Sequence, residues 1–289
     1  MARSITKEEI KKLAKQLNLE ILKEIGKGGQ KQVYKVQNLA SHEIKVLKVI
    51  IPDTELERLK REIRAVKIIN HDNIPKILET NIEEITSSSQ IAWILEEFVD
   101  GESLRIALNN GEKFSLKEIV VFLDTMFSIL EITESKNIVH RDIKPDNIII
   151  DNQEKFWLID FGIARHLDLE SLTKSNSPFG PCTIGYSASE QFRNRKKEID
   201  IRADLFSIGV VCAEMISGSN PYLKNAKDIL EVIKNIENRP LPLFKIEGDT
   251  QYLFARFIKT LGDNRISRRP RTVKETKRLF DLVKSTLKF

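Results

Sequence analysis

The sequence NIVHRDIKPDNIIIDNQEKFWLIDFG, residues 137–162, is the stretch around which the rest of the chain is organised. It contains two short apolar runs at 148–150 and 156–159, and the polar residues 151–153 lie between them. Two β-type runs joined by a polar turn predict a β-hairpin. The entrance and the exit of a hairpin lie at the same end, so side chains that flank it can meet there.

Polar side chains stand on both sides of this predicted hairpin. Asp142 and Asn147 precede it, and Asp160 follows the second apolar run directly. Two carboxylates and a carboxamide are oxygen ligands that suit Mg²⁺, which keeps waters and shares phosphate oxygens. The pattern therefore predicts a magnesium site at one end of the hairpin. The alternative is a polar hairpin around a buried His140 without any chemistry.

Composition bounds the class of protein. The 289 residues are 41% hydrophobic, which is ample for a packed core and for two lobes or domains. No apolar run is long enough for a transmembrane helix, and the N-terminus lacks the apolar core of a signal peptide. Two cysteines make neither a disulfide framework nor a zinc site. We therefore expect a cytoplasmic protein without a membrane partner.

The net charge of +5 arises from 47 basic and 42 acidic residues that are interspersed along the chain. Such a distribution is typical of a mixed, well-solvated surface, so no nucleic-acid partner is expected.

The segments His140–Asn147 and Asp160–Gly162 resemble the HRDxKxxN and DFG motifs of Hanks-type (eukaryotic-like) serine/threonine protein kinases, in the order and at the separation of that family. The resemblance implies an α+β, bilobal fold, with a small antiparallel sheet lobe that carries helix αC and a larger helical lobe. It also implies that Asp142 accepts the proton of the substrate hydroxyl and that Lys144 steadies the transferring phosphate. Asn147 and Asp160 would hold the metal ions.

Upstream, Gly26, Gly28 and Gly29 open a turn that runs into Val33 and resembles the kinase GxGxxGxV loop. Glycines let the backbone approach phosphates closely. Lys31 occupies the third glycine position. Because the loop joins two strands, a dinucleotide-binding fold, which needs a helix there, is disfavoured. The resemblance implies that the nucleotide is contacted by Ile25, Gly26, Gly28, Gly29, Val33, Val46, Lys48, Glu97, Val99 and Ile149.

Lys48 lies in the apolar strand 44–51, where the family carries the lysine that binds the α- and β-phosphates. The helix predicted at 53–70 resembles αC, and Glu62 is its best match for the glutamate that orients this lysine. In the strand 91–98, which precedes the hinge, the gatekeeper position is Glu96. That carboxylate needs a nearby lysine or arginine, or a path to solvent.

The segment 182–190 resembles the GTxGYxAPE motif that seats the substrate, with Ser189 in place of its proline. The resemblance implies an ion pair between Glu190 and Arg269. Thr183 is expected to contact Asp142 and Lys144. The helix 203–218 is apolar nearly all round and hence buried. In it, Asp204 is implied to tie the backbone of the catalytic loop to the core.

Three further helices are expected near 225–236, 250–261 and 271–287. At the other end of the chain, Thr6 and Glu9 have the spacing of a capping box at the start of a helix over 6–17. We expect this helix to pack on the first lobe as an extension, and we divide the chain into 1–18, 19–98 and 99–289.

The function that these motifs favour is transfer of the ATP γ-phosphoryl group to serine or threonine of protein substrates, with autophosphorylation. Mg²⁺ is the expected metal, and Mn²⁺ could replace it. A catalytically silent nucleotide-binding scaffold is the alternative, and a small-molecule kinase is a third reading that Lys144 and the full segment to Glu190 disfavour. Ser175 and Ser177 are candidate activating phosphorylation sites, because the resemblance implies that Arg141 needs a charge partner in this loop. The sequence sets neither the substrate nor the oligomeric state.

Overall fold

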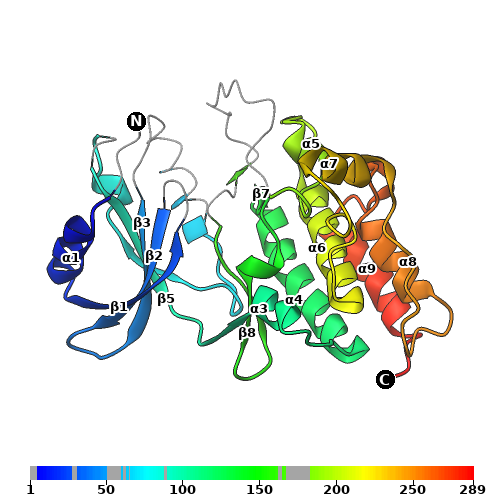
Figure 1. Ribbon diagram of the computed structural model, residues 1–289, viewed down its shortest axis with the longest axis horizontal. Coiled ribbons are helices and arrows are strands. Elements are labelled where there is room, and N and C mark those ends of the chain that lie inside the picture. The colour runs from blue at the N-terminus through cyan, green and yellow to red at the C-terminus, as the bar shows by residue number, and fades with distance from the viewer. Residues whose placement is uncertain are drawn as a thin grey trace. The chain divides into compact units, whose positions relative to one another are not determined.

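The chain divides into two compact units, Met1–Asp100 and Gly101–Phe289 (Figure 1). The computed structural model describes residues 5–27, 31–50, 60, 63–64, 66–87, 90–161, 165–166 and 183–289. Gly28, Gly29 and Glu62, most of the predicted helix 53–70, and the two candidate phosphorylation sites lie outside the described residues.

The first unit is built on a five-stranded antiparallel sheet with the order β1-β2-β3-β5-β4. Its strands are β1 (Leu19–Lys27), β2 (Lys31–Asn38), β3 (Ile44–Ile50), β4 (Ile77–Thr80) and β5 (Ala92–Glu97). The predicted strands at 19–25, 44–51 and 91–98 are therefore present with small changes at their ends. β4, which the sequence did not predict, pairs with β5 at the edge of the sheet.

The two faces of this sheet carry separate apolar clusters because successive side chains of a strand point to opposite faces. On one face, Leu47, Val49, Trp93 and Leu95 form a cluster with Ile10 and Ala14 of helix α1 (Lys7–Gln16). On the other face, Ala92, Ile94 and Ile50 pack with Ile63, Ile82 and Ile85. The sheet is thus covered on both sides.

Helix α1 begins with the predicted capping box: the Glu9 N–H donates to Thr6 Oγ1 at 3.2 Å, and the Thr6 N–H donates to Glu9 Oε2 at 2.9 Å. Ile10 of this helix is only 2% exposed. The expectation that α1 packs on the first lobe is confirmed, and it supplies part of that unit's hydrophobic core (Figure 1).

The second unit is mainly helical. Its helices are α3 (Leu104–Asn109), α4 (Leu116–Ser135), α5 (Ser189–Phe192), α6 (Ile201–Ser217), α7 (Ile229–Asn238), α8 (Leu253–Leu261) and α9 (Val273–Lys284). A three-stranded antiparallel sheet joins β6 (Gly101–Ser103), β8 (Ile148–Asp151) and β9 (Phe156–Leu158), and a two-stranded one joins β7 (Ile138–Val139) and β10 (Arg165–His166). The predicted hairpin is the pair β8–β9.

The expected bounds of the last three helices were wrong by a few residues, for local reasons. Asp228 and Thr272 are the N-caps of α7 and α9, since their side chains accept the N–H groups of Glu231 and Glu275. Tyr252 has a left-handed backbone with φ of 57°, so α8 starts after it.

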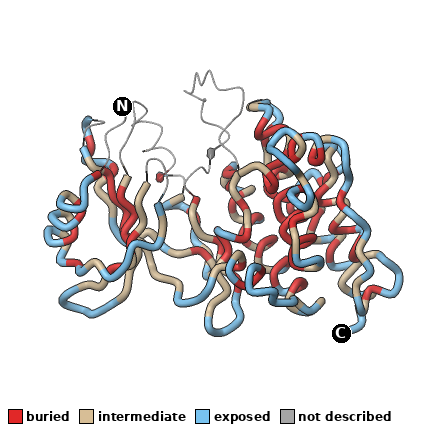
Figure 2. The backbone as a smooth tube through the Cα atoms, viewed as in Figure 1, coloured by how far each residue is buried: buried red, intermediate tan, exposed pale blue. Residues whose placement is uncertain are grey.

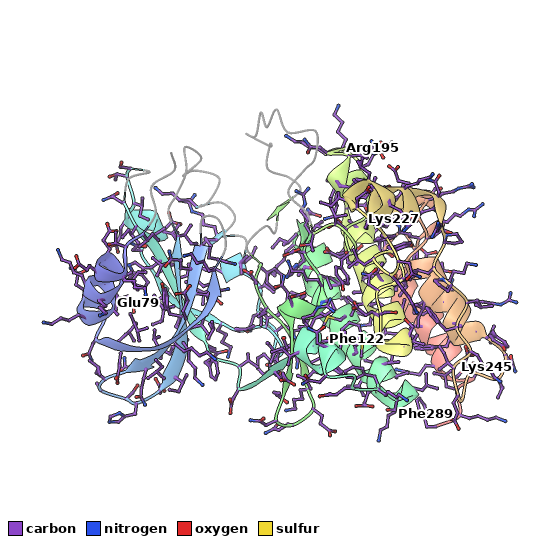
Figure 3. The ribbon with its side chains drawn as sticks, viewed as in Figure 1. Glu79, Phe122, Arg195, Lys227, Lys245 and Phe289 are labelled. Carbon is purple, nitrogen blue, oxygen red and sulfur yellow. The ribbon has the colours of Figure 1, made fainter. Side chains whose placement is uncertain are left out.

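Helix α6 is the buried centre of the second unit, as its all-round apolar sequence predicts, and Figure 2 shows it almost entirely in the colour of buried residues. It packs against α8 at Gly209, where a Cβ would lie 2.6 Å from the backbone nitrogen of Gly262. Phe122 of α4, labelled in Figure 3, packs edge-on to Phe156 of β9. This contact connects the helical core with the hairpin. In the part of the chain that the structure describes, every helix is too short or too polar to cross a membrane.

The packing of α1 predicts that Ile10→Ala destabilises the protein by about 2 to 5 kcal/mol, because it opens a cavity between the helix and the sheet. Lys11→Ala, on the exposed side of the same helix, is the matched control and should change stability by less than about 0.5 kcal/mol. Urea unfolding of both variants measures the difference. Equal stability of the two would show that α1 does not contribute to the core.

Candidate active site

The loop at 140–147, which contains Asp142, is anchored by a buried carboxylate. The backbone N–H groups of His140 and Arg141 donate to the two oxygens of Asp204, each at 2.8 Å. Asp204 lies in the first turn of α6 and is fully buried. Burial raises the pKa of Asp204 to about 7, against the opposite effect of the two N–H groups and of Arg141. The implied role of Asp204, tying this loop to the core, is confirmed.

Two backbone conformations at this site are strained. Arg141 has φ of 70° and Asp160 has φ of 63°, in the left-handed region that residues other than glycine rarely adopt. Such strain persists only where surrounding contacts impose it, and it gathers at functional sites. Here the Asp204 carboxylate and the side-chain amide of Gln191, which donates to the Arg141 carbonyl at 2.8 Å, fix the loop.

His140 joins the loop to the strand that delivers Asp160. Its Nδ1 accepts the N–H of Asp142 at 3.2 Å, so Nε2 carries the proton and faces the Ile159 carbonyl at 3.3 Å. Its ring lies 4.4 Å from that of Phe161. Burial lowers the pKa of His140 to about 4, although Asp142 and Asp160 favour its charged form, so it is neutral at pH 7. No spacing of residues in the chain predicts these contacts.

The Asp142 carboxylate is fixed by three side chains. Thr183 Oγ1 donates to Oδ1 at 2.6 Å, while Asn147 Nδ2 and Lys144 Nζ lie 3.0 and 2.8 Å from Oδ2. Lys144 Nζ also donates to Thr183 Oγ1 at 2.8 Å. The expected contact of Thr183 with both residues is confirmed, and the motif at 182–190 is thereby connected to the catalytic loop.

The predicted metal ligands lie at one end of the hairpin β8–β9, Asn147 at its entrance and Asp160 after its exit. Asn147 turns its Nδ2 toward Asp142, whose backbone carbonyl it meets at 2.8 Å, so Oδ1 is the atom that could face a cation. The Ile159 N–H donates to the Asn147 carbonyl at 2.9 Å, which brings Asp160 alongside.

These two oxygen donors fit Mg²⁺, which needs only one or two protein ligands when phosphate oxygens and waters complete its shell. Among the described residues, no three His, Cys, Asp or Glu side chains gather into a metal cage. The roles of Asn147 and Asp160 as metal ligands stay a prediction.

In the first unit, Lys48 Nζ lies 2.7 Å from Glu96 Oε2, and the two side chains are only 11% and 12% exposed. The charge of Glu96, which was expected to need a nearby lysine or arginine or a path to solvent, therefore has a lysine partner. Because Glu62 lies outside the described residues, its contact with Lys48 stays a prediction.

The other predicted nucleotide residues of the first unit lie on adjacent strands. Val33 of β2 is in register with Gly26 of β1 on one side and with Lys48 of β3 on the other. Val46 is in register with Glu96. The sheet thus brings the start of the glycine-rich turn next to the lysine strand. Ile25 lies in β1, Glu97 ends β5, Val99 follows it, and Ile149 lies in β8 of the second unit.

The segment that follows Thr183 is anchored by a buried ion pair. Arg269 Nη1 lies 2.5 Å from Glu190 Oε1, and the side chains are 0% and 2% exposed. Arg269 also donates to the carbonyls of Asp263 at 2.7 Å and Arg202 at 3.0 Å, so its charge and its N–H groups are satisfied. The predicted partner of Glu190 is confirmed, and Ser189 begins α5 where the family has proline.

A second polar cluster supports the segment that follows Thr183. The sequence did not predict it. Arg105 of α3 donates to Glu214 of α6 at 2.8 Å and to the Tyr186 hydroxyl, which itself donates to Glu214 at 2.5 Å. Burial, reinforced by Glu214, raises the pKa of Tyr186 above its ordinary value. Since the three residues are far apart in the chain, only the tertiary structure could reveal this cluster.

A carboxylate fixed beside a lysine, next to two oxygen donors that fit Mg²⁺, is the arrangement on which phosphoryl transfer depends. The arrangement is therefore typical of the phosphotransferase class. The family model described as the protein kinase domain matches residues 19–288, so the chain belongs to the protein kinase family. The predicted Hanks-type relationship and the α+β fold, a sheet unit and a helical unit, are confirmed.

Curated relatives agree with this assignment. The chain is 30% identical over 208 residues to the probable serine/threonine-protein kinase PknB of Lactococcus lactis, covering 70% of this chain and 32% of that protein. It is 28% identical over 247 residues to PknB of Mycobacterium leprae, with 83% and 39% covered. It is 30% identical over 224 residues to PknA of Mycobacterium tuberculosis, with 76% and 51% covered. The chain thus matches about a third to a half of the length of these relatives.

The Glu190–Arg269 pair predicts that Arg269→Ala loses about 3 to 5 kcal/mol of stability, because a buried carboxylate is left without its partner. Phosphate transfer should fall as well, since the segment around Thr183 loses its anchor. Arg268→Ala is the control, because that neighbouring side chain is 60% exposed. Thermal and urea unfolding measure the effect, and an unchanged melting temperature for Arg269→Ala would contradict it.

Proposed function

We propose that this chain is an active kinase that transfers the γ-phosphoryl group of ATP to serine or threonine hydroxyls of protein substrates and to itself. The observation that supports it best is the Asp142 carboxylate, which Thr183, Asn147 and Lys144 hold in one orientation. A reaction of this kind depends on positioning and on charge stabilisation more than on covalent chemistry.

In this mechanism, Asp142 orients the substrate hydroxyl and accepts its proton as the oxygen attacks the γ-phosphorus, the bond to the β–γ bridging oxygen breaks and ADP leaves. Lys144, within 2.8 Å of both Asp142 and Thr183, places a positive charge beside the phosphoryl group in transfer. Asn147 and Asp160 would hold magnesium, which neutralises charge on the phosphate oxygens when bound. Mn²⁺ is a second candidate for the same ligands.

The first unit would contribute most of the nucleotide contacts. Lys48 binds the α- and β-phosphates, Glu62 orients it, and Gly26, Gly28 and Gly29 bring backbone N–H groups to the phosphates. The remaining nucleotide contacts would come from Ile25, Val33, Val46, Glu97, Val99 and Ile149.

A catalytically silent scaffold is the alternative function. The contacts around Asp142 speak against it, because a protein that only binds nucleotide has no need for a lysine and a threonine arranged around that carboxylate. A small-molecule kinase is disfavoured for a related reason. The contact of Thr183 with Asp142 fixes the following segment beside the catalytic loop, where that segment would seat the hydroxyl of a peptide substrate.

The proposal predicts that Asp160→Asn abolishes autophosphorylation with ATP and Mg²⁺, because a metal ligand loses its charge while the fold is kept. Asp124→Asn, at an exposed ion pair with Lys284, is the matched control and should retain wild-type activity. Transfer of radiolabelled phosphate to the protein itself and to a generic basic protein measures the effect. Wild-type protein that binds ATP but transfers no phosphate would replace this proposal with the scaffold.

A second prediction concerns control by phosphorylation. Arg141 is fixed next to Asp142 through its backbone, and a phosphate adds about −1.5 to −2 charge and several acceptor oxygens that arginine can bind. We expect mass spectrometry of active protein to find phosphate on Ser175 or Ser177. The double substitution Ser175→Ala and Ser177→Ala should then lower activity.

In an Arg141→Ala background, the same two substitutions should have almost no further effect, since the charge partner is gone. Active protein without phosphate on residues 171–177 would exclude this form of control.

A further inference from the structure

The Lys48–Glu96 pair is fixed by the register of two strands. Lys48 of β3 is opposite Ile94 of β5, and Glu96 is opposite Val46. The two side chains are therefore diagonal neighbours on one face of the sheet, a separation that long side chains bridge. The observed distance between Nζ and Oε2 is 2.7 Å.

The apolar surroundings of the Lys48–Glu96 pair make the burial of either charge alone energetically costly. The same face carries the apolar cluster of Ala92, Ile94 and Ile63, and both charged side chains are nearly nine-tenths buried. A buried ammonium is costly unless a carboxylate compensates it, and removing one partner of such a pair leaves the other uncompensated. Glu96 thus compensates the buried Lys48 ammonium within the sheet.

Pairing also restricts where the ammonium can lie. A lysine side chain has a flexible four-carbon stem and loses much rotamer freedom when it is held. Glu96 belongs to β5, which is hydrogen-bonded on both sides, to β3 and to β4. The carboxylate that fixes Lys48 is therefore attached to the interior of the sheet itself.

We propose that Glu96 is a positioning residue that holds the Lys48 ammonium for the phosphates of the nucleotide, in addition to the predicted role of Glu62. This inference rests on the proposed function, in which Lys48 binds those phosphates. An ammonium has three N–H donors, so Lys48 is able to donate to Glu96 and to a phosphate oxygen at the same time. Glu96 then acts through Lys48 and does not contact the base.

The test compares ATP with adenosine, because only ATP has phosphates for Lys48 to bind. Calorimetry with Glu96→Gln should show ATP binding weakened about tenfold, equivalent to about 1.4 kcal/mol, while the dissociation constant for adenosine stays within about twofold of wild type. In a Lys48→Met background, Glu96→Gln should change neither constant. Glu79→Gln is the control, because Glu79 (labelled in Figure 3) is an exposed glutamate on the neighbouring strand β4.

Glu96→Asp provides a second variant should Glu96→Gln fail to fold. It keeps the charge but shortens the side chain by one methylene, so ATP affinity should fall less than with glutamine and adenosine affinity should not change. Equal losses for ATP and adenosine, unchanged ATP binding, or tighter ATP binding in the Glu96 variants would each overturn the inference.

Transfer of phosphate by the wild type is measured alongside. A wild type that neither binds ATP nor transfers phosphate would overturn the proposed function and this inference together. Normal wild-type activity with Glu96 variants that bind ATP normally would overturn only this inference.

Discussion

The catalytic loop depends on one buried carboxylate, that of Asp204. Its two oxygens accept the N–H groups of His140 and Arg141, and so they fix the backbone immediately before Asp142. Because α6 is buried along nearly its whole length, this anchor cannot move without disturbing the core of the second unit. The strained backbone of Arg141 persists because the Asp204 carboxylate fixes it.

From this anchor, polar contacts extend outward. Asp142 is held by Thr183, and the segment after Thr183 is held in turn by Glu190 with Arg269 and by Tyr186 with Glu214. Each link is a buried or half-buried hydrogen bond to a charged group, of the kind that costs most when one partner is lost. The geometry around the Asp142 carboxylate is therefore a property of the whole helical unit.

In the first unit, the corresponding constraint is the buried Lys48 ammonium, which lies in a sheet that is covered on both faces. Helix α1 covers one face, and the apolar cluster on the other face lies on the same side of the sheet as Lys48. Glu96, which breaks the usual apolar pattern of its position, is the local compensation. A departure from the family's pattern thus has a physical reason in the neighbouring strand.

The sequence by itself determined the family, the hairpin β8–β9 and the positions of Asp142, Asn147 and Asp160, because these residues are close in the chain and their spacing is local. It also predicted the capping box of α1, in which two side chains one turn apart satisfy each other. The Glu190–Arg269 pair was predictable only through the resemblance. The tertiary structure alone decided that Lys48 pairs with Glu96 and that Arg105 contacts Tyr186 and Glu214. It also decided which ring nitrogen of His140 carries the proton. These contacts depend on strand register and helix packing, which bring together residues that no spacing in the chain relates.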